Sequence, residues 1–139
     1  MKESTITKPA LLSTLWIFAT LNYLYCDIMG LMDMSLLQQY LTGSVNGMQI
    51  SENFLLGAAI LMEIPMAMVF LSRVLKPKVN RIANIASGSI MTLVQIATLF
   101  VGSVTSYYLF CSLVEIATTA SIVYIAFYWS DHRTKEAGN

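Results

Sequence analysis

The stretch Leu11–Asp33, LLSTLWIFATLNYLYCDIMGLMD, decides the fold of this chain. It is long and apolar enough to cross a bilayer, for which about 20 residues suffice. It also carries Asn22, Tyr23 and Asp27, polar groups that a plain lipid anchor does not need. An acid at this depth is costly in hydrocarbon and usually faces protein or water. We therefore expect this segment to form one wall of a bundle of membrane-spanning helices.

The composition is that of a membrane protein. Of the 139 residues, 56% are hydrophobic and 12% are charged, and soluble domains carry about twice that charged fraction. The net charge of zero gives no support for nucleic-acid binding. Cys26 and Cys111 form no C-x-x-C motif, and His132 alone cannot form a histidine metal cluster. We expect one transmembrane domain over residues 1–139 in the plasma membrane of a bacterium, with no metal and no cofactor.

Four apolar segments are each long enough to cross a bilayer, and they predict an all-α, four-helix membrane bundle. The spans are expected at about 11–31, 53–71, 82–101 and 107–129. Residues 34–41 could form a short interfacial helix, and Ser51 is a good N-cap for the second span. The basic segment 73–81 is interpreted as a loop broken by Pro77.

The positive charges predict the topology. Lys and Arg occur only before the first span, between the second and third spans, and after the fourth. An even number of spans places these three regions on one side of the membrane. The positive-inside rule makes that side the cytoplasm, so both termini are expected to be cytoplasmic.

Polar residues recur at helical spacing in the expected spans, so those of each span share a face. The helix rise of about 1.5 Å per residue places polar groups of all four spans in one layer of the outer half of the membrane. Two carboxylates in such a layer do not both ionise easily. We expect a pocket for a proton, a cation or a small polar molecule, built around Glu63 and Glu115, with Asp27 at its mouth and Tyr23, Gln95 and Asn22 beside them.

Two other functions stay open. The same polar groups can hold helices together by hydrogen bonds, in which case the chain is a structural subunit that packs against a partner membrane protein or a second copy of itself. An intramembrane enzyme is the third candidate, although no nucleophile–base pair stands out. Cys26 and Cys111 fall at similar depth, so a disulfide is conceivable, as are two ordinary buried thiols.

Residues 12–33 and 55–75 resemble a family of small bacterial four-span membrane proteins classed as a domain of unknown function. More distantly, the plan is similar to DoxX-like four-helix membrane proteins. The resemblance implies four helices and a bacterial inner membrane, and it implies no established activity. Small multidrug-resistance transporters share this length but place their essential glutamate in the first span, which has none here. The positions that look like the family signature are Asn22, Asp27, Asp33, Glu63 and Pro65.

Overall fold

The computed structural model describes residues 6–102 and 104–129, where the chain forms five helices and one small hairpin. The all-α class is therefore confirmed, whereas the charged tail with His132 lies outside the described residues. The helices are α1 (Lys8–Met32), α2 (Met34–Leu41), α3 (Glu52–Val74), α4 (Pro77–Thr98) and α5 (Ser106–Phe127), and the hairpin strands are β1 (Ser44–Val45) and β2 (Met48–Gln49).

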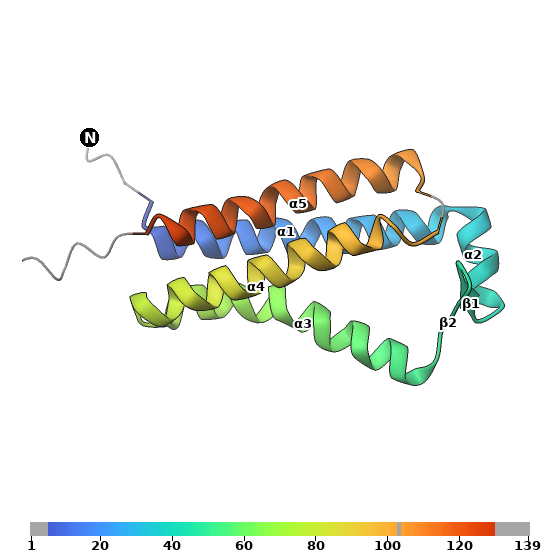
Figure 1. Ribbon diagram of the computed structural model, residues 1–139, viewed down its shortest axis with the longest axis horizontal. Coiled ribbons are helices and arrows are strands. Elements are labelled where there is room, and N and C mark those ends of the chain that lie inside the picture. Colours follow the sequence, from blue (N-terminus) through green and yellow to red (C-terminus); the bar gives the residue numbers. More distant parts are fainter. Residues whose placement is uncertain (1–5, 103, 130–139) are drawn as a thin grey trace, which may run out of the picture.

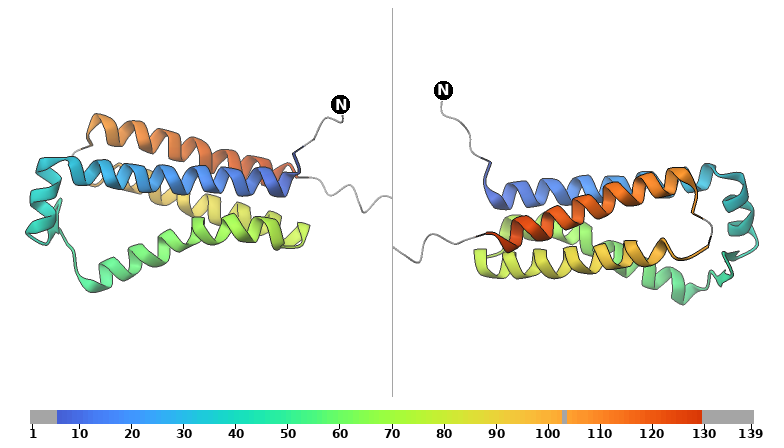
Figure 2. Two further views of the ribbon diagram at one scale, coloured as in Figure 1. Left: turned by 180° about the vertical axis from the view of Figure 1, so that it is seen from behind. Right: turned by 45° about the horizontal axis from the view of Figure 1, so that its top comes forward.

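The four long helices lie side by side as a bundle (Figures 1 and 2). Helix α5 packs against both α1 and α4, and α3 packs mainly against α1. The start of α1, the end of α5 and the α3–α4 turn lie at one end, which we call the terminal end. Helix α2 and the hairpin lie at the opposite end, which we call the α2 end, together with the α4–α5 connection.

Among the described residues, three helices are long and apolar enough to cross a membrane, namely α1, α3 and α5. Helix α4 has a similar length of 22 residues but carries more polar side chains. Its Asn80, Asn84 and Gln95 are buried inside the bundle, whereas its Ile82 and Leu93 are exposed. The outward-facing side of α4 is thus more apolar than the average composition of the helix.

The helix boundaries follow local capping chemistry. Helix α2 spans the residues 34–41 expected for an interfacial helix, and the Ser51 Oγ accepts a hydrogen bond from the Phe54 amide at 3.2 Å. Helix α4 begins at Pro77, earlier than the expected residue 82, so the interpretation of 73–81 as a loop is corrected. Proline is favoured in the first turn of a helix, where its missing N–H is not needed. Pro77 therefore starts the helix.

The connection between α2 and α3 contains the small hairpin of β1 and β2. Asn46 and Gly47 have φ values of 50° and 80°, the conformation of the two-residue type I′ turn that joins hairpin strands. The Asn46 amide donates to the Gln39 side-chain oxygen at 2.8 Å, which ties the hairpin to α2. Gly102 lies against the Asn46 side chain, and a Cβ at that glycine would overlap it. The hairpin thus touches both α2 and the α4–α5 connection.

The core seam of α1 follows a spacing of alternately four and three residues. This is the 3.5-residue repeat with which a helix faces its neighbours in a bundle. Met68 of α3, Met91 of α4 and Ile122 of α5 pack against it. The seam consists of Leu12, Trp16, Ala19, Tyr23, Cys26 and Gly30, all buried.

A buried polar network joins α1, α3 and α4 near the terminal end. Trp16 Nε1 donates to Asn84 Oδ1 at 2.7 Å, and Ser72 Oγ donates to the same oxygen at 3.2 Å. Asn84 Nδ2 donates to Asn80 Oδ1 at 2.7 Å, and Asn80 Nδ2 donates to the Ser72 carbonyl at 2.6 Å. All four residues are fully buried. Since every polar group named here has a partner, the network strengthens the bundle.

Helices α4 and α5 approach closely at Gly88. A Cβ at this position would lie 2.7 Å from Val123 Cγ2 and 3.3 Å from the Thr119 carbonyl oxygen. Small residues permit such close approach between membrane helices. One turn away, Thr92 Oγ1 donates to Thr119 Oγ1 at 2.7 Å.

Helix α3 packs along only part of its length. Residues 51–60 are all exposed, whereas Pro65, Met68 and Ser72 are buried. Proline inside a helix removes a backbone hydrogen bond and commonly bends it. Figure 1 shows the half of α3 nearer α2 leaving the bundle.

Candidate functional site

The described residues place polar groups in two adjoining layers near the α2 end. The deeper layer, which we call the inner cluster, comprises Asn22, Tyr23, Gln95, Ser112 and Glu115. Glu115 is 1% exposed, and its Oε1 accepts a hydrogen bond from Asn22 Nδ2 at 3.1 Å. Gln95 Nε2 donates to Ser112 Oγ at 2.8 Å, one turn of α5 away from Glu115. Four of the six residues predicted for the site thus lie in this cluster.

The inner cluster has unused hydrogen-bonding capacity. The Tyr23 hydroxyl is buried and has no partner among the described residues. A buried polar group without a partner costs free energy. A water molecule or a polar ligand atom would satisfy it.

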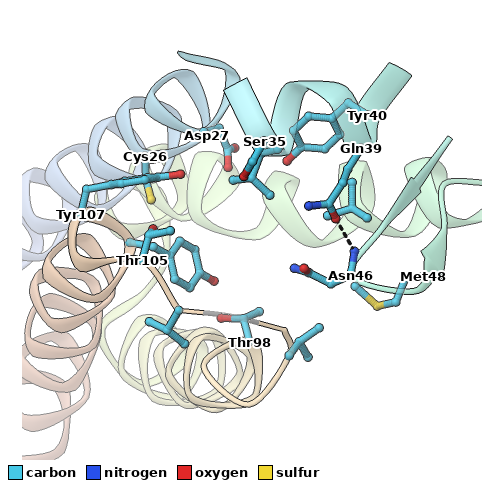
Figure 3. A pocket seen from close by; sticks show the side chains of 16 residues that line it. Cys26, Asp27, Ser35, Gln39, Tyr40, Asn46, Met48, Thr98, Thr105 and Tyr107 are labelled. Carbon is cyan, nitrogen blue, oxygen red and sulfur yellow. Dashed lines mark hydrogen bonds between the residues drawn. The ribbon is translucent and has the colours of Figure 1, made fainter. Parts of the chain in front are cut away.

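The second layer is a cavity of about 230 Å³, seen in Figure 3, which we call the α2-end cavity. Its walls come from α1, α2, the hairpin, the end of α4 and the start of α5. Apolar side chains, including Leu36, Val45 and Val101, supply part of the lining. The polar lining consists of Asp27, Ser35, Gln39, Tyr40, Asn46, Thr98, Thr105, Tyr107 and Tyr108.

Asp27 is the carboxylate of this cavity, one helical turn from Tyr23 along α1. No Lys or Arg is among the described residues that line it. The Thr105 Oγ1 is buried and finds no partner in the described part of the chain. Thr98 lines the cavity while its Oγ1 donates to the Gln95 carbonyl at 2.8 Å, so the cavity and the inner cluster adjoin. Asp27 thus lies in the cavity that adjoins the inner cluster.

The roof of the cavity is α2, and Asp33 holds its first turn. The Asp33 Oδ1 accepts hydrogen bonds from the amides of Ser35 at 2.9 Å and Leu36 at 3.4 Å. Hydrogen bonds from Ser35 and from these amides lower the pKa of Asp33. At the other end of α2, burial raises the pKa of Tyr40, and the nearby carboxyl of Asp27 adds to the rise. Tyr40 and Asp27 both line the cavity.

A match to a known family covers nearly the whole chain. Residues 2–136 match the family of unknown function DUF6326. The chain belongs to the DUF6326 family. Among the curated proteins and the solved structures compared with it, none matches. The expected membership of a family without known function is confirmed, whereas bacterial origin and likeness to DoxX-like proteins stay predictions for this DUF6326 chain.

Glu63, predicted to share a pocket with Glu115, does not join it. In this DUF6326 chain Glu63 is exposed and Glu115 is buried against Asn22. Glu63 is not among the residues that line the α2-end cavity. The physical reason is the course of α3, whose first half leaves the bundle and has residues 52–60 all exposed. The carboxylate found beside the inner cluster is instead Asp27.

Sequence reasoning missed the residues that α2 and the hairpin bring to the DUF6326 cavity. Tyr40, Gln39 and Asn46 line it because the chain folds back over the end of the bundle. The Asn-Gly turn was the available signal for that fold-back. Cys26 and Cys111 are both buried free thiols, so the disulfide alternative is not realised. Within the described residues no group of three or more His, Cys, Asp or Glu could hold a metal ion.

Proposed function

We propose that the chain is a four-span protein of a bacterial plasma membrane with both termini in the cytoplasm. Three apolar helices support this, and the inward polar face of α4 suits a fourth span. Lys8 Nζ donates to the Tyr128 carbonyl at 3.4 Å, and Arg81 Nη2 donates to the Phe127 carbonyl at 2.9 Å. These cations satisfy carbonyls at the end of α5. They also give the terminal end the positive charge typical of the cytoplasmic side.

We further propose that the protein binds a small polar or cationic molecule in the α2-end cavity, on the side of the membrane away from the cytoplasm. The observation that carries this proposal is a cavity of about 230 Å³ that contains the Asp27 carboxylate and no basic residue among its described lining. The buried Glu115 below it adds further acidic character. Transport would need a path past the inner cluster, whereas binding needs the cavity alone.

The test is whether solutes enter the cavity. In a background with Cys26→Ala and Cys111→Ala, Thr98→Cys places one thiol on the cavity wall. A small, neutral thiol reagent added from outside sealed cells should modify it. Gly30→Leu should block the reaction, because a Cβ at Gly30 meets only the Tyr107 hydroxyl at 4.0 Å and a larger side chain would enter the cavity.

Thr42→Cys is the matched control, since Thr42 is exposed at the end of α2 and does not line the cavity. It should react from outside at a rate that Gly30→Leu leaves unchanged. Lys76→Cys, in the α3–α4 turn, should react with a membrane-impermeant reagent only after the cells are opened. Failure of Thr98→Cys to react, or equal rates with and without Gly30→Leu, would contradict the binding proposal. Reaction of Lys76→Cys in sealed cells would contradict the topology.

A second candidate function, packing against another membrane protein or a second copy, is favoured by Glu63. This carboxyl is exposed near the middle of an apolar helix of 23 residues, and acids at such depths usually face protein or water. Another subunit covering this face would shield it from lipid. The accessory-subunit proposal predicts that Glu63→Cys cross-links to a neighbouring chain in native membranes and that Phe70→Cys, exposed two turns away, helps to map the same face. A monomer without cross-links would count against it.

A further inference from the structure

The polar lining of the α2-end cavity contains one carboxylate and, among the described residues, no Lys or Arg. Asp27 supplies a carboxylate, and Thr98 already directs its hydroxyl hydrogen to the Gln95 carbonyl, which leaves its lone pairs free. Gln39 uses its side-chain oxygen to hold the Asn46 amide, as the dashed line in Figure 3 shows. An anion in this cavity would meet a carboxylate without a compensating cation. The occupant that suits this lining is positively charged.

Three aromatic rings accompany the carboxylate. Tyr40, Tyr107 and Tyr108 all line the cavity, and Figure 3 shows Tyr40 and Tyr107 on either side of Asp27. The electron-rich face of an aromatic ring attracts cations, and sites for alkylated ammonium groups are commonly built from such rings. The apolar lining, which includes Leu36 and Val101, suits the carbon atoms that such a ligand carries.

The volume limits the size of the ligand and argues against a bare metal ion. Drug-sized ligands fill pockets of about 300–1,000 Å³, and this cavity holds about 230 Å³. At about 30 Å³ per water molecule in the liquid, that is space for roughly eight non-hydrogen atoms. A metal ion would leave most of this space empty, and no set of three or more metal-binding side chains lies within the described residues.

We propose that the α2-end cavity binds a small organic ammonium ion, with Asp27 as its counter-ion and the tyrosine rings around its alkyl groups. This inference rests on the proposed binding function and names the chemical class of the ligand. The positive nitrogen lies near the Asp27 carboxylate, and the carbon atoms contact the rings and the apolar wall.

The experiment measures choline binding to the full chain in maltoside micelles, which contain no ammonium group. Choline should bind saturably. Its neutral carbon isostere, dimethylbutanol, should bind at least about tenfold more weakly, because shape is kept and charge is lost. Tetrabutylammonium, which exceeds the cavity, should not compete. Gly30→Leu should abolish choline binding because it fills the space.

Variants of Asp27 and Tyr40 test the contributions of the carboxylate and the aromatic ring separately. Asp27→Asn should weaken choline binding at least about tenfold, whereas Glu52→Gln, which neutralises an exposed carboxyl outside the cavity, should leave it unchanged. Tyr40→Leu should weaken binding about two- to thirty-fold, and Tyr40→Phe, which keeps the ring, should restore it. Because Tyr40 lies on the short helix α2 and not in the bundle core, its variants test the site even where Asp27→Asn does not fold.

The outcomes distinguish failure of the ammonium inference from failure of the broader binding proposal. If Thr98→Cys reacts from outside but choline neither binds nor slows that reaction, the ammonium inference is overturned while the binding proposal stands. Equal affinity for choline and dimethylbutanol, or equal loss in Tyr40→Phe and Tyr40→Leu, would also overturn it. If Thr98→Cys does not react at all, both proposals fall.

Discussion

Replacing Asn84 with alanine should destabilise the bundle strongly, because this side chain is the centre of the buried network at the terminal end. The change removes the oxygen that accepts from Trp16 and Ser72 and the nitrogen that donates to Asn80. Interhelical hydrogen bonds in membrane proteins average about 0.6 kcal/mol each, and a buried polar group left without a partner costs about 1–3 kcal/mol. Four hydrogen bonds are disrupted. The buried donors of Trp16 and Ser72 are left unsatisfied at about 1–3 kcal/mol each, which gives an expected loss of about 2–6 kcal/mol.

The assay is reversible unfolding by dodecyl sulfate in mixed micelles, followed by circular dichroism. Ser121→Ala is the matched control, since Ser121 is exposed and its hydroxyl donates only to the Ala117 carbonyl of the same helix. Trp16→Phe keeps the ring and removes the N–H donor, so its effect and that of Asn84→Ala should be non-additive in a double-mutant cycle. A loss no larger than that of Ser121→Ala, or additive effects in the cycle, would refute the reasoning.

Three further predictions concern packing, pH and the inner cluster. Gly88→Ala should lower the free energy of unfolding by about 1–2 kcal/mol because the new Cβ overlaps Val123, and Val123→Ala should partly restore it. Gly57→Ala is the control, since a Cβ there meets nothing within 4 Å, and it should be neutral or slightly stabilising. An equal loss at both glycines would contradict the packing argument. The folded pKa of Asp33 is lowered, so its cap on α2 is fully present above the unfolded pKa of about 4 and is lost as the pH falls through the folded pKa. The protection of residues 34–41 against hydrogen exchange, taken relative to the intrinsic rate at each pH, should fall there, and Asp33→Asn should remove this pH dependence. Tyr23→Phe removes a buried hydroxyl that has no partner among the described residues, so the same unfolding assay should show equal or greater stability, and a clear loss would reveal a bond that the structure does not contain.

Much of the bundle could be predicted from the sequence because helix patterning is local. The polar stripe on the last span is the buried face of α5, which includes Ser112 and Glu115, since residues three or four apart share a helix face. The length of the apolar segments predicted the four long helices. The confinement of Lys and Arg to three regions agreed with an even number of them. The start of α4 was misplaced because Pro77 was interpreted as a breaker, although proline is equally common where a helix begins.

The site was harder to predict because depth along a helix does not give the direction in which a side chain points. Glu63 and Glu115 were assigned to one layer, yet one is exposed and the other buried. What separates them is the departure of α3 from the bundle, a tertiary feature that no periodicity records. The aromatic part of the cavity was also hidden, since Tyr40 reaches it only after the chain turns back over the bundle.

The two ends of the bundle differ in how completely their buried polar atoms are satisfied. Near the termini, Trp16, Ser72 and Asn84 exchange hydrogen bonds within the protein, so that end can hold its shape without help from solvent. Towards α2, the hydroxyls of Tyr23 and Thr105 lack partners in the described chain. The terminal end therefore needs no added molecule to satisfy the polar groups of this network, whereas the α2 end has buried hydroxyls that a bound molecule can satisfy. Substitutions at the terminal end should mainly alter how firmly the helices associate. Substitutions at the α2 end should mainly alter which small molecules the protein binds.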